Sequence, residues 1–578
     1  MAHTAHPVDK RYVCDILEEI GTLLELQGAN RFRVLAYAKA ARALDSVTED
    51  IHALVREQRL TDIPGIGEAL SQKITELVTT GRLTYYDELR RSFPDGLLAL
   101  LRVPGLGPKK VKVLYDELGI TSLGELEYAC QENRLLDLTG FGQKTQENIL
   151  KGLAFLQRHQ DRRLYSEALA AAEAVAALLR KQSGVKALAV CGSLRRHNET
   201  IGDIDILVAG ANAKLMHAFT TGPQVERVLA EGETKSSVQL RSGIQCDLRL
   251  VSVEEFPFAQ LYFTGSKEHN VLLRSRAIKR GLKLNEYGLY QGHKRLPCAD
   301  EAVIYKTLGL AYIPPELREG MDEIELAERG KLPELIEPKH IRGVFHTHTN
   351  FSDGAATLEQ MAAAAKRQGY HYMGVSDHSQ SATYAHGMQP ADVKRQQREI
   401  DALNERLKGL RLLKGAEVDI LPGGALDYPD ALLATMDFVI ASVHSRFTMG
   451  EEEMTARIIT AMRNPHVTML GHPTGRLLLA REPYAVNLTH VIDAAADLGV
   501  VVELNANPHR FDLDWRMCRY AQERGVLVSI NPDAHQTDGL ADTAFGVGIA
   551  RKGGLGADDV LNTRTLADVL PLLSRREK

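Results

Sequence analysis

The chain has 578 residues, which is too long for one hydrophobic core and predicts roughly four domains of about 150 residues each. Hydrophobic residues make up 44% and charged residues 25%, a composition typical of folded globular proteins and not of disordered or collagen-like chains. Lys and Arg total 70 against 75 Asp and Glu. The resulting net charge of -5 argues against a uniformly basic protein that coats nucleic acid.

Cysteine usage and apolar patterning favour a soluble, intracellular protein. The six Cys include no CxxC pair, which argues against a zinc ribbon or a disulfide framework. No apolar run approaches the ~20 residues that span a bilayer, and residues 1–10 lack the apolar segment of a secretion signal. We therefore expect a cytoplasmic, nucleoid-associated monomer with no membrane contact.

Residues 1–160 predict helices separated by glycine turns, since period-2 alternation is scarce there. Three turns are alike: Ile63-Pro64-Gly65-Ile66-Gly67, Val103-Pro104-Gly105-Leu106-Gly107 and Leu138-Thr139-Gly140-Phe141-Gly142. Such a turn can bring the N–H groups of a helix N-terminus against a phosphate, and a simple link between packed helices is the alternative. The repetition favours binding of the DNA backbone, as in helix-hairpin-helix motifs. The expected contacts are Gly65, Gly67, Gly105, Gly107, Lys109, Lys110, Gly140, Gly142 and Lys144.

Paired aspartates follow an Ala-rich helix expected near 164–181, in a region with strand-like runs at 187–191, 204–208, 238–240 and 244–251. Asp203 and Asp205 are two residues apart and so face one side of a strand. Asp247, on a later run, could join them. Divalent cations relieve the repulsion among three carboxylates and hold the phosphates of a nucleotide. Alternating Asp on a half-exposed strand is the alternative.

A glycine and a serine precede these aspartates at a spacing that favours nucleotide binding. Gly192 and Ser193 end a strand-like run ahead of Gly202-Asp203-Ile204-Asp205. Their backbone and hydroxyl groups offer a cradle for a triphosphate, to which Arg196 would add positive charge.

From residue 341 onward, strand-like runs alternate with amphipathic helices and predict a mainly parallel α/β sheet or barrel. Of the 20 His, 12 lie at or after His340. Nearly every candidate ligand follows a strand-like run, so the ligands should converge on one mouth of a barrel. A set of N and O ligands without thiolate suits Mn²⁺, Zn²⁺ or Fe²⁺, although a single His is more often structural. The ordered candidates are His346, His348, Asp353, Asp377, His378, Glu417, His444, His472, Asp533 and His535.

The run GSLRRHNETIGDIDILV resembles the sequence of family X DNA polymerases of the nucleotidyltransferase superfamily. Tyr262-Phe263-Thr264-Gly265-Ser266 is similar to the thumb motif of that family, and the resemblance continues through Asn285-Glu286-Tyr287-Gly288. It implies that Asp203 and Asp205 bind two ions, Mg²⁺ or Mn²⁺, and that Asp247 completes the one that activates the primer 3′-hydroxyl. Attack on the α-phosphate of a dNTP would release pyrophosphate. The residues implied to contact the nucleotide or the template are Gly192, Ser193, Arg196, Tyr262, Phe263, Gly265, Asn270 and Arg274.

The resemblance also reaches the N-terminal region, through Arg31-Phe32-Arg33. It places Lys73 where members with deoxyribose-phosphate lyase activity carry the lysine that forms a Schiff base, and an ordinary exposed helix lysine is the alternative. Phe32 and Glu68 stand where lyase-proficient members carry basic or polar residues. Gln245, near the third aspartate, and Lys267, near the nucleotide, are further departures from the family pattern.

The order HTH…DG…DH…E…H…H…DxH resembles the PHP family of metal-dependent phosphoesterases, usually a distorted α/β barrel with up to three ions. His386 and His509 fall outside this pattern. The resemblance implies one ion held by His346, His348, Glu417 and Asp533, a second by Glu417, His444 and His472, and a third by Asp353, His378 and His535.

Together these patterns predict a multidomain α+β protein with a helical N-terminal region bearing helix-hairpin-helix motifs. A nucleotidyltransferase-type palm and thumb would follow, and then a C-terminal distorted α/β (PHP) barrel. The expected boundaries are 1–85 for a lyase-like DNA-binding domain, 86–160 for fingers, 161–255 for the palm, 256–315 for the thumb, 316–340 for a linker and 341–578 for the PHP domain.

The expected function is a repair polymerase that fills short gaps in gapped or nicked DNA with dNTPs, as in base excision repair. The PHP site would act as a 3′-to-5′ exonuclease, a 3′-phosphatase or an abasic-site endonuclease. Two alternatives stay open: a nuclease whose polymerase module only positions DNA, and a non-enzymatic scaffold at DNA ends.

The charge balance predicts a weak dependence of DNA binding on salt. Residues 1–160 contain 20 Lys and Arg against 22 Asp and Glu, so N–H cradles and a few lysines should supply the phosphate contacts. We expect a shallow slope of log affinity against log salt, well below that of proteins making about 6–10 phosphate contacts. Fluorescence anisotropy with gapped DNA at several salt concentrations measures this slope, and a steep slope would contradict the prediction.

Overall fold

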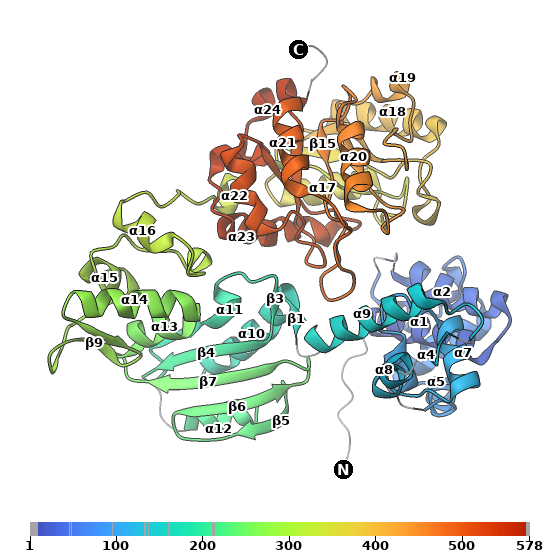
Figure 1. Ribbon diagram of the computed structural model, residues 1–578. Coiled ribbons are helices and arrows are strands. Elements are labelled where there is room, and N and C mark those ends of the chain that lie inside the picture. Colours follow the sequence, from blue (N-terminus) through green and yellow to red (C-terminus); the bar gives the residue numbers. More distant parts are fainter. Residues whose placement is uncertain are drawn as a thin grey trace. The chain divides into compact units, whose positions relative to one another are not determined.

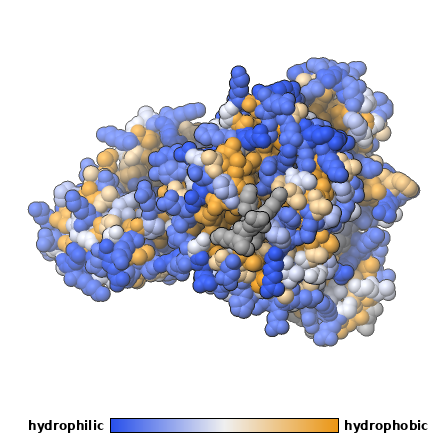
Figure 2. Space-filling view, turned by 90° about the horizontal axis from the view of Figure 1, so that it is seen from above, coloured by the Kyte–Doolittle hydropathy of each residue, from blue (hydrophilic) through white to orange (hydrophobic). Residues whose placement is uncertain are grey.

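The computed structural model describes residues 10–45, 47, 49–94, 96–131, 134–136, 138–159, 162–210 and 214–573. The polar segment 1–9 of the sequence analysis lies outside the described residues. The chain forms two compact units, residues 1–160 and 161–578, whose elements are labelled in Figure 1. Within the described part, no helix is long and apolar enough to cross a membrane. On the face shown in Figure 2, hydrophilic residues cover most of the surface and hydrophobic ones form separate patches.

The first unit is entirely helical in its described part, as its sequence pattern predicts. Its core is built from aliphatic residues at helical spacing, such as Leu17, Ile20 and Leu24 on α1, which pack with Leu44 and Leu114. The helices are α1 (Lys10–Gln27), α2 (Arg31–Asp45), α3 (Ile51–Arg56), α4 (Glu68–Thr80), α5 (Thr84–Arg91), α6 (Leu97–Leu100), α7 (Pro108–Leu118), α8 (Leu123–Gln131) and α9 (Gln143–His159).

The three glycine turns have the same backbone conformation. Their first glycines, Gly65, Gly105 and Gly140, have φ values of 98°, 87° and 86°, which side chains disfavour. The second glycine of each turn directly precedes α4, α7 or α9. No heavy atom lies within 4 Å of a side-chain position at any of these six glycines. The turns therefore leave the backbone at three helix N-termini open for contact.

The palm is a five-stranded sheet of order β2-β4-β7-β6-β5, in which β4 and β7 are parallel. Ile204, Ile206 and Val208 point from β4 into the core under α10 and α12, whereas Leu207 packs with Ala259 of α13 on the other face. The strands are β1 (Arg163–Leu164), β2 (Ala187–Val190), β3 (Thr200–Ile201), β4 (Asp203–Ala209), β5 (Val225–Ala230), β6 (Lys235–Leu240) and β7 (Gln245–Val251); the helices are α10 (Tyr165–Arg180), α11 (Gly192–Arg195) and α12 (Lys214–Thr220).

Part of the stretch expected to be a linker, 316–340, packs against the hydrophobic core of the thumb. Arg318 is fully buried, and its Nη1 lies 2.6 Å from Oε1 of Glu301 while its Nε donates to the carbonyl of Ile313. The charged residues of this stretch suggested a linker. In the structure, Arg318 is instead paired with Glu301 inside the fold. The elements are α13 (Phe256–Thr264), α14 (Lys267–Lys279), β8 (Lys283–Asn285), β9 (Gly288–Gln291), β10 (Lys294–Arg295), α15 (Glu301–Thr307) and α16 (Glu323–Glu328).

The C-terminal part is a parallel sheet of seven strands in sequence order. The first and last strands meet through a parallel bridge between Thr347 and Ala534, so the sheet curls into a distorted barrel, as predicted. The strands are β11 (Gly343–Val344), β12 (Tyr372–Val375), β13 (Arg411–Asp419), β14 (Phe438–Ser442), β15 (Met469–Leu470), β16 (Val501–Asn505) and β17 (Val528–Asn531). The helices are α17 (Leu358–Arg367), α18 (Pro390–Arg406), α19 (Asp430–Leu433), α20 (Glu451–Met462), α21 (Leu488–Leu498), α22 (Trp515–Glu523), α23 (Thr543–Lys552) and α24 (Leu566–Leu573).

Two strand glycines make room for an aromatic ring inside the barrel. A Cβ at Gly415 would lie 2.3 Å from the ring of Phe438, and one at Gly374 would lie 2.6 Å from it. Phe438 is buried and packs edge-on against Phe345, with ring centroids 5.1 Å apart.

We expect Gly415→Ala to destabilise the barrel by about 1–3 kcal/mol, because the added methyl group overpacks a fixed ring. Gly423→Ala is the matched control, since no atom lies within 4 Å of its Cβ position. Calorimetric unfolding of both full-length variants measures the difference. Equal melting temperatures for the two would contradict this packing argument.

Candidate active sites

The three palm aspartates come together on one face of the sheet. Asp203 and Asp205 are on β4, and Asp205 is the direct neighbour of Asp247 on the parallel strand β7. They share the face of Leu207, against which the thumb helix α13 packs. The alternation along β4 thus places Asp203 and Asp205 on one face of the sheet, as their spacing predicts.

Burial and mutual repulsion perturb this group. Burial first, and then the charges of Asp203 and Asp247, raise the pKa of Asp205 from 3.8 to about 7. Asp247 differs: burial raises its pKa, but hydrogen bonds from Gln245, Ser237 and Lys235 outweigh this and lower it. Gln245 donates to Oδ1 of Asp247 over 2.9 Å, and Lys235 lies 3.2 Å from Oδ2. Sequence reasoning noticed Gln245 but missed Lys235, which the antiparallel strand β6 supplies.

The predicted nucleotide cradle lies directly against the aspartates. A Cβ at Gly192 would lie 2.5 Å from Oδ2 of Asp205, so only glycine fits there. Ser193 follows on α11, and Arg196 ends that helix. The Nη1 of Arg196 donates to the carbonyl of Thr264 over 2.6 Å, which links the cradle to the thumb motif.

The aromatic pair of the thumb motif ends α13. The rings of Tyr262 and Phe263 meet edge to face with centroids 5.1 Å apart. The guanidinium of Arg249 lies 4.3 Å from the Phe263 ring centroid. Asn270 donates to the carbonyl of Tyr262 over 2.8 Å, and Arg274 donates to the carbonyl of Asn270. The predicted nucleotide residues of the thumb are therefore neighbours in space, and Gly265 lies beside Arg196.

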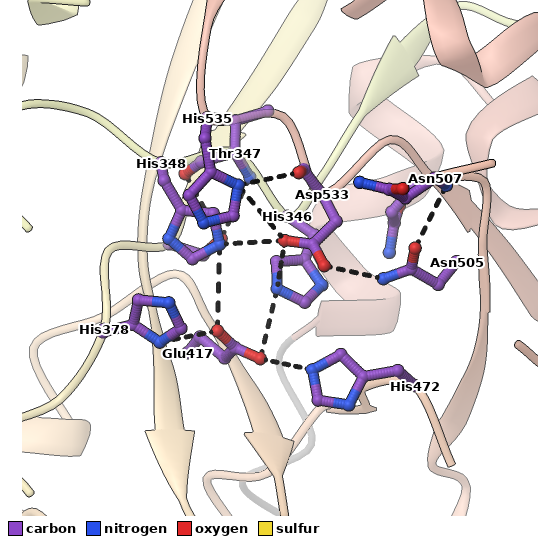
Figure 3. A network of polar contacts seen from close by, with 12 residues as sticks. His346, Thr347, His348, His378, Glu417, His472, Asn505, Asn507, Asp533 and His535 are labelled. Atoms are coloured by element: carbon purple, nitrogen blue, oxygen red, sulfur yellow. Dashed lines mark hydrogen bonds and ion pairs between the residues drawn. The ribbon is translucent and has the colours of Figure 1, made fainter. Parts of the chain in front are cut away.

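The nine predicted PHP ligands converge at the barrel mouth. Figure 3 labels His346, His348, His378, Glu417, His472, Asp533 and His535 among them. His346 and Asp533 have φ values of 54° and 51° and lie beyond the ends of β11 and β17. The pairs His346/His348 and Asp533/His535 therefore converge through left-handed turns in the loops beyond the strands. The groups that could hold an ion are His348, Asp353, His378 and His535; His346, Glu417 and His472; His346, His348 and Asp533; and His378, Glu417 and His444.

Glu417 lies at the centre of the cluster. Its Oε1 is 3.2 Å from Nε2 of His346, 3.2 Å from Nε2 of His444 and 2.8 Å from Nε2 of His472. Its Oε2 is 2.9 Å from Nδ1 of His378 and 3.7 Å from Nε2 of His348. Burial would raise the pKa of Glu417, but His444, His346 and His378 hold it well below its usual range.

The remaining predicted ligands surround two other carboxylates. Asp533 lies 3.5 Å from Nε2 of His346 and 3.2 Å from Nε2 of His348. Asp353 lies 3.7 Å from Nε2 of His378 and 3.5 Å from Nε2 of His535. The groups in the structure differ from the predicted sets, because His346, His348 and Asp533 lie together without Glu417, and His444 and His472 share no group.

The donor atoms of this cluster suit metal ions. Ligand bonds of 2.0–2.1 Å in tetrahedral geometry separate neighbouring ligands by about 3.3 Å, which matches the distances around Glu417. Nε2 of His346, Nδ1 of His348 and Oε2 of Glu417 are buried, and within the described chain they have no hydrogen-bond partner. Buried polar atoms are rarely left in this state. The cluster therefore fits an ion-binding role.

Two further carboxylates orient the imidazoles, and the sequence analysis missed both. Oε1 of Glu503 on β16 lies 2.6 Å from Nδ1 of His346, and Oδ1 of Asp419 on β13 lies 2.5 Å from Nδ1 of His444. Such contacts fix the ring so that Nε2 faces the ion. The available signal was a lone acidic residue at the end of an apolar run, next to Leu504 in one case and two residues after Glu417 in the other.

Asp377, a candidate ligand in the sequence analysis, instead braces the ligand loop. It is fully buried and accepts hydrogen bonds from Thr349, Ser352 and Gln396. His386 and His509, which the sequence pattern left aside, belong to none of the ion-binding groups found among the described residues.

The predicted DNA contacts of the first unit lie at the open turns. Lys109 and Lys110 are in the first turn of α7, and Lys144 is in that of α9. Lys73 lies on α4, with its Nζ 4.9 Å from the ring centroid of Tyr85.

Family models match four stretches of the chain. A helix-hairpin-helix domain matches residues 9–83, a SAM-like helix-hairpin-helix tandem 97–154, the DNA polymerase beta thumb 259–319 and the PHP domain 345–507.

Curated relatives match the whole chain or parts of it. The DNA polymerase/3′-5′ exonuclease PolX of Bacillus subtilis (strain 168) is 39% identical over 575 residues, covering 98% of this chain and all of the relative. DNA polymerase lambda of Rattus norvegicus is 27% identical over 53% of this chain and 56% of its own length. A probable phosphatase of Thermoanaerobacter sp. (strain X514) is 28% identical over 38% of this chain and 89% of its own length.

The fold and the two sites define a nucleotidyltransferase-type polymerase module joined to a PHP phosphoesterase module, which confirms the predicted fold class. The chain belongs to the family X DNA polymerases with a C-terminal PHP domain, the family of PolX of Bacillus subtilis.

The raised pKa of Asp205 predicts a pH-dependent gain in stability for Asp205→Asn. The folded pKa of about 7 exceeds the ordinary value of 3.8, so without metal the folded chain loses stability as pH rises between these values. In EDTA at pH 8, we expect D205N to exceed the wild type by about 1–3 kcal/mol. The gain should be smaller at pH 5, and incorporation should be lost. Thermal unfolding at both pH values tests this, and an equal gain at both would contradict it.

Proposed function

We propose that the protein fills short gaps in DNA with its polymerase module and hydrolyses phosphoester bonds at DNA 3′ ends with its PHP module. One observation carries the proposal: all the expected carboxylate and imidazole ligands occur in a chain that aligns over 98% of its length with a polymerase/3′-5′ exonuclease. Retention of both sets argues against a scaffold that only binds DNA.

In the polymerase module, Asp203 and Asp205 would hold both ions, Mg²⁺ or Mn²⁺, and Asp247 would complete the site nearer the primer. Such ions neutralise the triphosphate and the attacking hydroxyl when bound. Ser193 and Arg196 would bind the triphosphate. The Tyr262 and Phe263 rings would face the sugar of the incoming nucleotide, which favours dNTPs over ribonucleotides.

In the PHP module, the nine ligands would hold up to three ions, Mn²⁺, Zn²⁺ or Fe, which activate water and clamp a phosphate when bound. Glu503 and Asp419 would keep His346 and His444 oriented toward them. The proposed substrate is the terminal phosphodiester of a 3′ end, with a 3′-phosphate or an abasic site as related substrates of the same chemistry.

The open glycine turns of the first unit would bind the DNA backbone. Three helix N-termini with exposed N–H groups provide sequence-independent phosphate contacts. Gapped or nicked duplex is the proposed ligand, because the polymerase module requires a primer end.

A second candidate places hydrolysis first, with the polymerase module as a weak DNA positioner. The observation in its favour is that, among the described residues, compact sets of three or more ligand atoms occur only in the barrel. Asp203, Asp205 and Asp247 do not form such a set.

One experiment separates these functions. The protein is incubated with a one-nucleotide-gapped duplex labelled at the primer, with and without dNTPs, in the presence of Mn²⁺. Extension supports gap filling, and shortening without extension supports hydrolysis as the main activity. Unchanged DNA that is retarded on a native gel would support the scaffold.

Two substitutions should separate the activities. We expect Asp247→Ala to reduce nucleotide incorporation about 10³-fold or more while hydrolysis is retained, and His444→Ala to do the converse. Incorporation and release of the labelled nucleotide are measured on the same duplex. Equal loss of both activities in either variant would refute a two-site protein.

A further inference from the structure

We propose that Lys552, on helix α23 of the PHP barrel, is a positioning residue for the polymerase site, where it holds Arg196 through Glu319 in the orientation that binds a triphosphate. This inference rests on the proposed role of Arg196 and adds a residue from the other module to the same site. The nucleotide cradle would then be completed by the PHP barrel.

Two contacts fix the guanidinium of Arg196. Its Nη1 donates to the carbonyl of Thr264 over 2.6 Å, and its Nε donates to Oε1 of Glu319 over 3.1 Å. The side chain is only 12% exposed, so it has little freedom to choose another rotamer. These contacts engage two of the three nitrogens, and Nη2 is the one through which the planar group can meet a further anion.

Lys552 contacts the same oxygen of Glu319 that Arg196 contacts. Its Nζ donates to Oε1 of Glu319 and, over 3.1 Å, to the backbone carbonyl of Arg196. The side chain is 2% exposed, and the ammonium lies 4.7 Å from the ring centroid of Trp515. Burial lowers the pKa of Lys552, and the contact with Glu319 opposes this change. One carboxylate oxygen is thus shared by a cation of the palm and a cation of the barrel.

The charge balance of this trio matters for an anionic ligand. Glu319 alone would neutralise Arg196, whereas the three charged groups together carry a net charge of +1. Without Lys552, the trio loses its positive charge and Glu319 loses the contact that fixes it. Both effects would weaken the attraction of the site for a triphosphate, and the low solvent exposure makes the electrostatic effect stronger than in water.

The residues between Arg196 and Asp203 also pack against the barrel. The ring of His197 stacks on Tyr165 with centroids 5.0 Å apart and packs so closely on α23 that a Cβ at Gly548 would lie 2.1 Å from it. Glu199 forms an ion pair of 2.5 Å with Arg476, which follows the metal-ligand loop of the barrel. The segment between the cradle and Asp203 therefore uses the barrel as its support.

The test is steady-state single-nucleotide incorporation by the full-length protein on one-nucleotide-gapped DNA. Lys552→Met keeps an unbranched side chain against Trp515 and removes the charge. We expect KM for dNTP to rise about tenfold, equivalent to about 1.4 kcal/mol, with kcat and DNA affinity changed less than about twofold. Lys552→Arg should restore KM to within about threefold of the wild type, because it can donate to the same oxygens.

Arg551→Met is the matched control. Arg551 is the adjacent residue on α23, but it binds Glu316 and the carbonyl of Ile336 and not Arg196. We expect this variant to keep KM within about twofold of the wild type. Hydrolysis of a 3′-labelled single strand should be unchanged in all three variants, which shows that the barrel is folded.

Two results would overturn the role of Lys552: a wild-type KM in Lys552→Met, or an equal rise in KM in Arg551→Met. Arg196→Ala distinguishes this failure from failure of the proposed function. If Arg196→Ala raises KM and Lys552→Met does not, only the role of Lys552 falls. If Arg196→Ala itself has a wild-type KM, both the proposed nucleotide site and the role of Lys552 are refuted.

Discussion

The buried carboxylate of Glu417 requires imidazoles from across the barrel, and this requirement accounts for much of the C-terminal architecture. Five histidines face it within 3.7 Å, and they follow β11, β12, β14 and β15 of the sheet. An open sheet would keep the ligands after β11 far from those after β17. The bridge between Thr347 and Ala534 closes that distance. Closure of the sheet thereby brings the buried carboxylate of Asp533, after β17, within 3.5 Å of His346 and His348, after β11.

Sequence patterns predicted the parts of the fold in which burial is continuous. β14 (Phe438–Ser442) is buried at every position, so its apolar run was visible in the sequence. β5 (Val225–Ala230) was missed because nearly all of its side chains are exposed, which leaves no hydrophobic pattern. Candidate ligands were found because they follow such buried runs. Glu503, Asp419 and Lys235 were not, because each acts only through a partner that folding brings beside it, namely His346, His444 and Asp247 respectively.

The proposed DNA contacts do not require a basic surface. Backbone N–H groups at the three glycine turns carry no formal charge, and the third turn adopts the same conformation without a proline. The polymerase and PHP clusters are themselves acidic until cations bind. A total charge of -5 is therefore compatible with a protein whose phosphate contacts are made by dipoles and bound ions.

The ring beside Lys552 belongs to the only tryptophan of the chain, Trp515. Intrinsic tryptophan fluorescence of the unmodified protein thus arises from a single point, at the junction between the barrel and the nucleotide loop. Two cations lie close to this ring, the guanidinium of Arg516 at 4.8 Å and the ammonium of Lys552 at 4.7 Å from its centroid, so its emission is sensitive to charge changes at this junction. A change in Trp515 emission on addition of dNTP would therefore show that the proposed nucleotide site affects the PHP barrel.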